Sequence, residues 1–468
     1  MRNMRKIKRN YRRIIMKKLF ALMLALVMVL SLVACGGGKG GKVEKGSNKT
    51  ASGESDKDVM IDIWTIWAND NKRIVWWEGK AAEFAAQYEA ETGISVEIGF
   101  FNQSGYNGVA EKLTAGTVSG TLPVMSMCEE QQMIQFKAIA EDQSKYVSKA
   151  VIDDYVDGLM VSCIWDGVVR AFPCGRSYTM MAINLDVLAA TGYTVDDLAT
   201  WDGLRAACKK AAELGYNGWA LTWDSDGWYW ETHLYAEGGQ IASDDTKKIT
   251  FMDNNVGAIY MQEVKEMVAE GSALNLYGVV EDPDDGFKEL LATNQLLAYQ
   301  CSCTSYVSLQ TMAEEAGISV NKDIIYMMDL PAGKTTGQKS VTTGGSNWFI
   351  TTAGTETQKQ VAGKFIEFLA QPANAAGWNQ ASGYVCITKG GLASDEYKAI
   401  VGDDPNFQRI NEGLQYAHAR ATTPYWREMY TYMNDFFWDF GANSDKYDPV
   451  AYMQELADYC QKIIDDAQ

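Results

Sequence analysis

Side chains that could carry catalysis are few and scattered along the 468 residues. The two histidines, His233 and His418, are far apart in the sequence, which gives little support to a zinc site or a histidine-based triad. Neither G-x-S-x-G nor G-x-x-x-x-G-K-[ST] occurs. Glu129 and Glu130 could serve as a glycosidase-type pair, but adjacent residues of one strand or helix point apart. The sequence therefore favours a binding function over catalysis, and a secreted glycan-active enzyme is the competing class.

Three short motifs have some features of metal sites. Cys301-x-Cys303 lacks the two-residue spacing of zinc and redox pairs. Residues 224–227 (DSDG) and 282–286 (DPDDG) resemble parts of a calcium loop, but neither has the full twelve-residue ligand spacing. We interpret both acidic motifs as solvated turns and predict no metal and no cofactor.

The first 34 residues have the composition of an export signal. Nine Lys or Arg and no acid occupy residues 1–18, and residues 19–34 (LFALMLALVMVLSLVA) are almost wholly apolar. This run of 16 residues is shorter than the roughly 20 that a membrane-spanning helix needs. Residues 32–36 (LVACG) resemble the lipobox of bacterial lipoproteins, and the resemblance implies cleavage before Cys35 and lipidation of its thiol. An uncleaved signal anchor is the alternative, and translation from Met16 would give a shorter signal.

A polar segment follows Cys35. Residues 36–58 are rich in Gly, Ser and Lys and nearly free of large apolar side chains, which predicts a flexible tether. The nine basic residues of the signal would leave with it, so the remainder has 33 Lys and Arg against 60 Asp and Glu, a formal charge of −27. A surface this acidic repels nucleic acid and anionic lipid. We therefore expect a monomer that binds no nucleic acid and is lipid-anchored on the outer face of the cell membrane.

Eight further cysteines could form disulfides in an exported protein, but their scatter does not resemble a compact disulfide framework. They are Cys128, Cys163, Cys174, Cys208, Cys301, Cys303, Cys386 and Cys460. Disulfide pairing and free buried thiols are equally good interpretations. The 14 Trp and 24 Tyr supply flat faces that suit sugars, although most such side chains belong to cores.

From Val59 onward, strand and helix patterns alternate. Residues 59–66 predict a buried strand, residues 81–88 carry the apolar stripe of a helix that ends at Gly93, and residues 94–100 predict a second strand. This order implies a parallel pair joined by a right-handed crossover. Further strands are predicted at 122–127, 168–172, 179–183 and 324–330, and further helices at 201–214, 255–270, 361–369 and over most of the last hundred residues. The class is α/β, and roughly 410 residues predict two lobes.

Ordered motifs in the second half of the chain indicate a family. Residues 330–331 (LP) and 343–346 (TGGS) precede the run AGKFIEFLAQPANAAGW at 362–378, which is followed by SGY at 382–384. From Val59 to the C-terminus, the chain resembles the family 1 extracellular solute-binding proteins of ABC importers. The resemblance implies a two-lobed, type II periplasmic-binding-protein-like fold, with a mainly parallel sheet flanked by helices in each lobe. A hinge would close the lobes over a small ligand, which permease subunits in the membrane then receive.

The resemblance also suggests lobe boundaries. We predict an N-lobe from residues 59–171 and 302–345, and a C-lobe from residues 172–301 and 346–468. The chain is expected to cross between the lobes near Pro173, Cys301 and Gly345.

Within the family, the sequence is most similar to the sn-glycerol-3-phosphate-binding proteins. The positions that match their ligand-contact motifs are Tyr106, Glu129, Ser177, Ser302, Gly345, Tyr384 and Arg420. In such a site Arg420 would supply positive charge, while Ser177, Ser302 and the Gly345 N–H would complete an oxyanion cage. Glu129 would accept hydrogen bonds from ligand hydroxyls, and the two tyrosines would pack on the carbon face of the ligand.

Three features depart from the glycerol-phosphate pattern. Residues 385–387 (VCI) replace the usual Leu-Pro after Tyr384, Arg176 stands where a small polar residue is usual, and residues 219–230 hold four Trp. Trp228 and Trp230 at a cleft would stack on pyranose rings. We therefore predict a sugar or oligosaccharide ligand, with sn-glycerol 3-phosphate or a glycerophosphodiester as the alternative. A surface adhesin that binds polymeric glycan is a third interpretation.

Overall fold

The computed structural model of the chain describes residues 57–68, 71–221, 227–280, 282–315, 317, 323–423 and 425–467. Residues 55–468 form one compact unit. The predicted signal, Cys35, nearly all of the tether and Trp223 lie outside the described residues. Among the residues that are described, no helix combines the length and the apolar character needed to span a membrane.

Local sequence explains the first strand–helix–strand unit. β1 (Val59–Thr65) buries every second residue, and α2 (Lys72–Thr92) buries one apolar stripe that includes Trp77. The Asn71 side chain caps the start of α2, and Gly93 ends it in the left-handed region at φ 74°. β2 (Val96–Asn102) pairs with β1 in parallel, which confirms the predicted parallel pair.

The described strands form one large mixed sheet in the order β2-β1-β3-β11-β6-β9-β7-β8, with β10 added to β6 and β12 added to β11. The remaining bounds are β3 (Met125–Glu129), β6 (Phe172–Asn184), β7 (Asn217–Ala220), β8 (Ala273–Leu274), β9 (Leu296–Ser302), β10 (Ile325–Met328), β11 (Val341–Ile350) and β12 (Ala417–His418). β4 (Ile164–Trp165) and β5 (Val168–Val169) form a separate hairpin.

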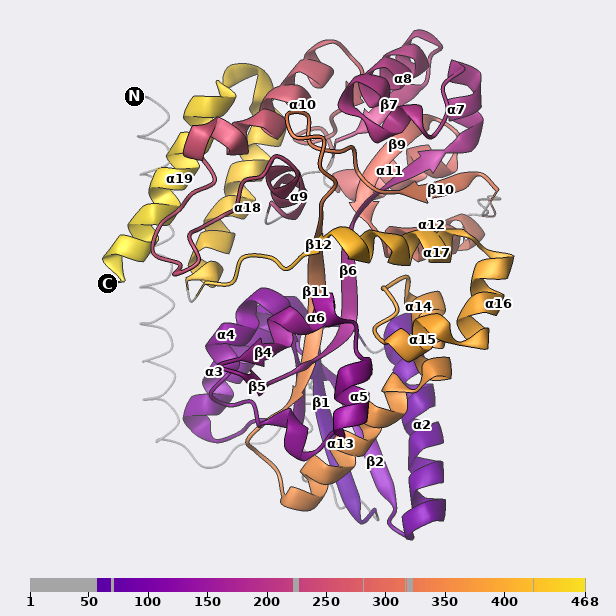
Figure 1. Cartoon of the computed structure of the whole chain (residues 1–468), viewed down its shortest axis with the longest axis vertical. Helices are drawn as coiled ribbons and strands as arrows, with labels where there is room; N and C mark the ends of the chain where they lie inside the picture. Colours follow the sequence, from indigo (N-terminus) through magenta and orange to yellow (C-terminus); the bar gives the residue numbers. More distant parts are fainter. Residues whose placement is uncertain are drawn as a thin grey trace, which may run out of the picture. The chain divides into compact units, whose positions relative to one another are not determined.

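Two groups of parallel strands flank a pair of long antiparallel strands. β1 is parallel to β2 and β3, and β7 is parallel to β8 and β9. β6 and β11 are antiparallel to each other, and they link the two groups into one hydrogen-bonded sheet (Figure 1). The parallel character predicted for each lobe therefore holds for the outer strands, whereas the centre is antiparallel. Of β6, the sequence pattern predicted the end at 179–183 and, through the strand predicted at 168–172, only the first residue. Polar residues and Gly175 interrupt the apolar run between them, although all of β6 is buried.

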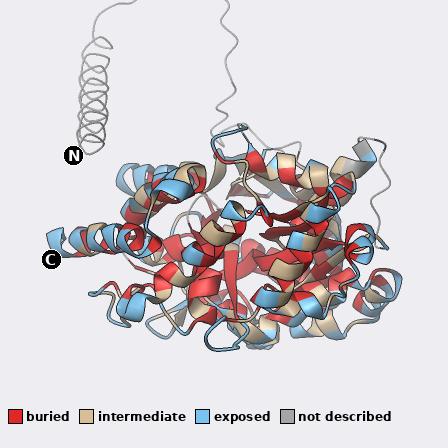
Figure 2. Ribbon diagram, turned by 90° about the horizontal axis from the view of Figure 1, so that it is seen from above, coloured by how far each residue is buried: buried red, intermediate tan, exposed pale blue. Residues whose placement is uncertain are grey.

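Helices cover this sheet, and buried residues concentrate on the strands while the outward helix faces are exposed (Figure 2). α13 (Glu356–Ala370) packs on β1 and α2, α8 (Trp201–Glu213) on β7, and α9 (Trp228–Ala236) on β11. The other helices are α3 (Gly105–Ser119), α4 (Met133–Phe136), α5 (Lys149–Asp154), α6 (Asp157–Met160), α7 (Leu185–Thr191), α10 (Ile259–Ala269), α11 (Pro283–Ala292), α12 (Ser305–Glu315), α14 (Pro372–Ser382), α15 (Lys389–Ala393), α16 (Asp395–Asp403), α17 (Asn406–Glu412), α18 (Trp426–Asn443) and α19 (Pro449–Asp466).

The contacts place some segments differently from the predicted lobe boundaries. β10 pairs with the same end of β6 as β9 does, on the opposite edge of that strand, and α12 packs on β9, so these elements of residues 302–345 lie with the second strand group. α13 and α14 pack on α2, so they lie with the first group. The chain thus does not pass between the two strand groups near Cys301. It passes from one group to the other along β6 and along β11, and it returns to the second group between α14 and α17. The reason is that β11 carries the chain toward the first group at Gly345, the reverse of the predicted direction.

Candidate functional site

The two long antiparallel strands bring several predicted site residues to one place. Gly345 of β11 pairs with Arg176 of β6, next to Ser177. On the other side of β11, Ser346 pairs with Glu129 at the end of β3. Because neighbouring strands lie about 4.8 Å apart, this register places Glu129, Ser177 and Gly345 close together in space.

Backbone geometry accounts for Gly345. Its φ of 100° lies in the region that favours glycine. A Cβ at this position would collide with the backbone oxygen of Gly175, so the close approach of β6 and β11 requires a residue without a side chain. A ligand contact through the Gly345 N–H stays a prediction.

Tyr106 and Tyr384 come to this place from separate segments. Tyr106 is the second residue of α3, and its hydroxyl accepts a hydrogen bond from Ser346 Oγ at 3.2 Å. Burial raises the pKa of Tyr106, and the neighbouring Tyr384 and Glu129 raise it further. Tyr384 follows Gly383, the left-handed C-cap of α14. The two tyrosines and Glu129 therefore share one partly dehydrated environment.

An aromatic face made by Trp67 and Tyr384 lies over Gly175 of β6. A Cβ at Gly175 would approach each of the two rings to 3.3 Å, so this glycine lets the rings come close to the strand. The ring centroids of Trp67 and Tyr384 are 6.0 Å apart, and Trp67 is half-buried. No sequence motif indicates Trp67, because it stands just past β1 outside any recognisable pattern.

Arg73 is the second residue at this place that no sequence motif indicates. Its guanidinium lies 5.0 Å from the ring centroid of Tyr384 and 5.7 Å from that of Trp67, and it donates a hydrogen bond to Ser382 O at 3.2 Å. Within the described part of the chain, Arg73 forms no ion pair with a carboxylate. It thus offers positive charge beside the aromatic face. An arginine in the first turn of a helix carries no sequence signal that would have identified it.

Trp228 and Ser302 flank the same crossing from the second strand group. Trp228 begins α9 and lies over Gly344, where a Cβ would come within 2.9 Å of its ring. Its indole N–H donates to a backbone oxygen of β11 at 2.9 Å. Ser302 ends β9 opposite Thr179 of β6, and its hydroxyl accepts a hydrogen bond from Thr304 at 3.0 Å. Both predicted residues are therefore next to β6 and β11.

Trp230 lies elsewhere. Residues two apart on an α-helix point to nearly opposite sides. The Trp230 ring is buried edge-on against Phe251, with centroids 5.0 Å apart, and its indole N–H donates to Gly257 O at 2.7 Å. These contacts support a core position for Trp230 rather than a place beside Trp228.

The two buried arginines already have protein partners. Arg420 Nε contacts Glu231 Oε2 at 2.7 Å, and its guanidinium lies 5.0 Å from the Trp426 ring centroid. Arg176 forms an ion pair with Glu130 and donates to Ser162 Oγ at 2.8 Å. The charge predicted at Arg420 is therefore compensated by Glu231. Sequence alone could not show this, because the two residues are 189 positions apart.

The site offers hydrogen-bonding groups and flat rings rather than a nucleophile. The eight described cysteines are free and buried, which supports the free-thiol interpretation. Burial raises the pKa of the Cys128 and Cys174 thiols, so these stay protonated. Burial lowers the pKa of His233 to about 3, and this side chain stacks on Tyr260 inside the second strand group. What remains at the crossing is a carboxylate, hydroxyls and rings, which suits recognition of a polar small molecule.

Comparison with solved structures shows the fold. The cyclic α-maltosyl-1,6-maltose binding protein from Arthrobacter globiformis matches with a TM-score of 0.71 and 17% identity, over 87% of this chain and 99% of that one. UgpB from Mycobacterium tuberculosis, solved with glycerophosphocholine, matches with a TM-score of 0.69 and 17% identity, over 87% and 98%. The sugar-binding protein MalE from Xanthomonas citri matches with a TM-score of 0.70 and 16% identity, over 87% and 98%. These matches confirm the predicted α/β fold of the periplasmic binding proteins.

The sequence comparison shows the family. No curated protein matches the chain significantly. The family model described as bacterial extracellular solute-binding protein matches residues 83–408, well over half of the chain. The similar proteins named above are binding proteins, in agreement with the predicted class. The chain belongs to the bacterial extracellular solute-binding proteins, which act outside the cytoplasm.

Proposed function

We propose that this chain is the substrate-binding lipoprotein of an ABC importer and captures a sugar or an oligosaccharide. The observation that carries the proposal is the aromatic face of Trp67 and Tyr384 beside the Glu129 carboxylate and the Tyr106 hydroxyl. A pyranose has an apolar face that stacks on such rings and a rim of hydroxyls that needs acceptors and donors. Structural similarity to a cyclic α-maltosyl-1,6-maltose binding protein and to a sugar-binding protein adds support.

A phosphorylated ligand is the second candidate, because Arg73 is a cation without a carboxylate partner in the described residues. An anionic group would meet Arg73 rather than Arg420, whose charge Glu231 compensates. The similarity to a protein solved with glycerophosphocholine keeps glycerol 3-phosphate and glycerophosphodiesters in this candidate class.

The cellular setting is part of the same proposal. Lipidation at Cys35 would hold the protein on the outer face of the cell membrane, and the segment up to residue 58 would tether it there. The binding protein would work as a monomer that releases its ligand to the permease subunits, without altering the ligand. In this proposal Ser177, Ser302, Gly345 and Trp228 contact the ligand together with the residues named above.

Calorimetry and thermal shift on residues 55–468 test the ligand class. We expect neutral mono- or oligosaccharides to bind, with about 2.7 kcal/mol of stabilisation at one hundred times the dissociation constant. Trp67→Ala and Tyr384→Ala should each weaken binding about ten-fold or more, which is about 1.4 kcal/mol. Trp438→Ala is the matched control, because Trp438 is 42% exposed on α18, and it should leave affinity unchanged.

Two other outcomes would change the conclusion. If only phosphorylated compounds bind, and Arg73→Gln abolishes that binding while Arg420→Gln chiefly lowers stability, the second candidate is correct. If any bound glycan is converted to product, the protein is an enzyme and the proposal of binding alone is wrong.

A further inference from the structure

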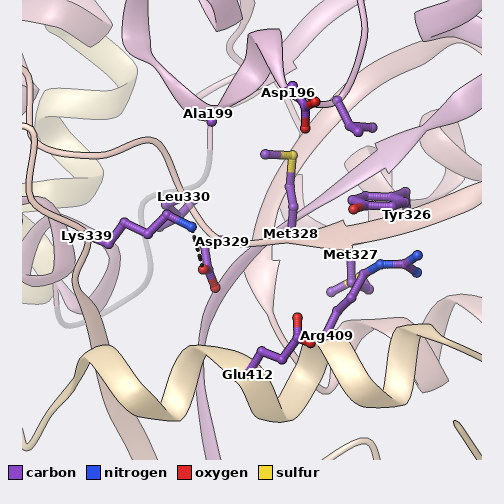
Figure 3. Close-up of a pocket in the computed structure, with 11 residues that line it drawn as sticks. Asp196, Ala199, Tyr326, Met327, Met328, Asp329, Leu330, Lys339, Arg409 and Glu412 are labelled. Atoms are coloured by element: carbon purple, nitrogen blue, oxygen red, sulfur yellow. Dashed lines mark hydrogen bonds and ion pairs between the residues drawn. The ribbon is translucent and has the colours of Figure 1, made fainter.

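A pocket lies between β10 and α17, away from the β6–β11 crossing. Its volume is about 190 Å³, and it is lined by residues of four segments: the connection from α7 to α8, β10 with the two residues after it, Lys339, and α17 (Figure 3). Liquid water occupies about 30 Å³ per molecule, so this space corresponds to about six waters. The pocket can therefore admit a small organic molecule.

Three carboxylates from three of these segments face the pocket. They are Asp196, Asp329 and Glu412. Asp329 Oδ2 has one cationic partner, Lys339 Nζ, at 3.4 Å. Asp196 and Glu412 form no ion pair within the described residues, and the Glu412 carboxylate accepts a hydrogen bond from Gln408 at 2.7 Å. Lys339 thus compensates only one of the three carboxylates, and it does so near the limit of ion-pair distance.

The other cation that lines the pocket has different partners. The Arg409 guanidinium lies 3.9 Å from the ring centroid of Tyr326 and donates a hydrogen bond to Asn406 Oδ1 at 2.9 Å. Figure 3 shows it beneath Tyr326 and pointing away from Glu412 and Asp329. Arg409 therefore shapes the pocket wall and leaves the carboxylates without a second cation.

Burial makes the negative charge of the Asp329 carboxylate costly in free energy. The Asp329 side chain is only 18% exposed. Burial raises the pKa of Asp329, Lys339 opposes the rise, and the nearby Glu412 adds to it. Asp329 is the most buried member of the group, whereas Asp196 and Glu412 are exposed. A cation between Asp329 and Glu412 would relieve the repulsion that Glu412 exerts on the Asp329 carboxylate.

We propose that this pocket binds a small organic amine, with its ammonium group between Asp329 and Glu412. An ammonium carries three N–H donors, which match carboxylate oxygens that converge from separate segments. Its hydrocarbon part would lie against Val195, Met328 and Leu330, which are among the apolar residues of the lining. This site is separate from the aromatic face at the β6–β11 crossing and does not depend on the function proposed there.

Titration calorimetry with the full chain in detergent tests the charge preference. The probes are putrescine, 1,4-butanediol, succinate and 4-aminobutyrate, which share a four-carbon backbone and differ in their end groups. We expect saturable binding of putrescine, weaker binding of 4-aminobutyrate, and none of the diol or the dicarboxylate. Asp329→Asn and Glu412→Gln should each lower putrescine affinity ten-fold or more. Glu78→Gln is the matched control, because Glu78 lies on the exposed face of α2, and it should leave putrescine affinity unchanged.

A gain-of-binding variant guards against misfolding as an explanation. Lys339→Met removes the protein's own competitor for Asp329, so putrescine affinity should rise three- to ten-fold. The proposal is wrong if putrescine fails to bind at millimolar concentration, if the diol or succinate binds as well, or if 4-aminobutyrate binds more tightly than putrescine. It is also wrong if Lys339→Met leaves the affinity unchanged or lowers it.

Discussion

The two buried arginines of the β6–β11 crossing and the carboxylates of the β10–α17 pocket differ in how far the protein compensates their charge. At the crossing, Arg176 is completely buried and paired with Glu130, and Arg420 is paired with Glu231 at 2.7 Å. In the pocket, Lys339 lies 3.4 Å from Asp329, while Asp196 and Glu412 form no ion pair within the described residues. Removing an ion from water costs several kcal/mol, so a buried charge needs a partner in the protein, whereas a partly open pocket lets water or a ligand supply it. Uncompensated charge therefore marks places that solvent or ligand can reach.

Breaking the buried pair should have the largest effect. Arg176→Met leaves the Glu130 carboxylate without its cation in a dry environment, so we expect the free energy of unfolding to fall by about 3–5 kcal/mol. Urea denaturation of the variant against the wild type measures this loss.

The double variant Arg176→Met, Glu130→Gln sharpens the test. It removes both charges, so it should recover roughly half or more of the stability that the single variant loses. Equal stability of the single and double variants would contradict our account of the crossing, because the loss would then come from packing and not from uncompensated charge.

The buried side chain of His233, which has no ionic partner within the described residues, should have an effect of intermediate size on the free energy of unfolding. Burial lowers the pKa of His233 to about 3, against an ordinary value of 6.5. Below pH 6.5 the unfolded chain gains a proton at His233 and the native protein does not, so stability falls as the pH falls toward 3 and is unaffected by this group above pH 6.5. The slope is about 1.4 kcal/mol per pH unit, or about 2 kcal/mol between pH 6.5 and 5.

His233→Gln should remove this part of the pH dependence. Melting temperatures or urea midpoints at pH 7.0, 6.0 and 5.0 measure it as the difference between variant and wild type. Because His418 is the only other histidine in the sequence, few other groups change protonation in this window. Parallel stability curves for the two proteins would show that His233 is protonated in the native state.

Removing one charge from the pocket should have the smallest effect, with the opposite sign. Glu412→Gln relieves repulsion with Asp329, so we expect the free energy of unfolding to rise by a few tenths of a kcal/mol, and by less at high salt. Thermal melts at low and high ionic strength measure it, with Glu78→Gln as the control. A clear loss of stability would mean that Glu412 is already compensated, which would remove the contrast between the two regions.

Much of the fold follows from local pattern, and part of the site does too. The strand–helix–strand start, the boundary at Gly93 and the helix at 201–213 agree with their periodicity. The lobe predicted for the residues after Cys301 differs from the strand group in which they lie, because that depends on which strands β10 and β11 join. Sequence motifs indicated Glu129, Ser177 and Tyr384, which lie together, but Trp67 and Arg73 have no motif and appear only through their contacts with Tyr384.

The amino-acid sequence by itself determined the alternation of strands and helices and the acidic balance of the chain, because these depend on neighbouring residues and on composition. Tertiary structure decided which charges are compensated. Arg420 meets Glu231 across 189 positions, while Arg73 lies on Tyr384 without a carboxylate in the described residues. The physical reason is that an ion pair depends on distance in space and on burial, and neither is encoded in the spacing of residues along the chain.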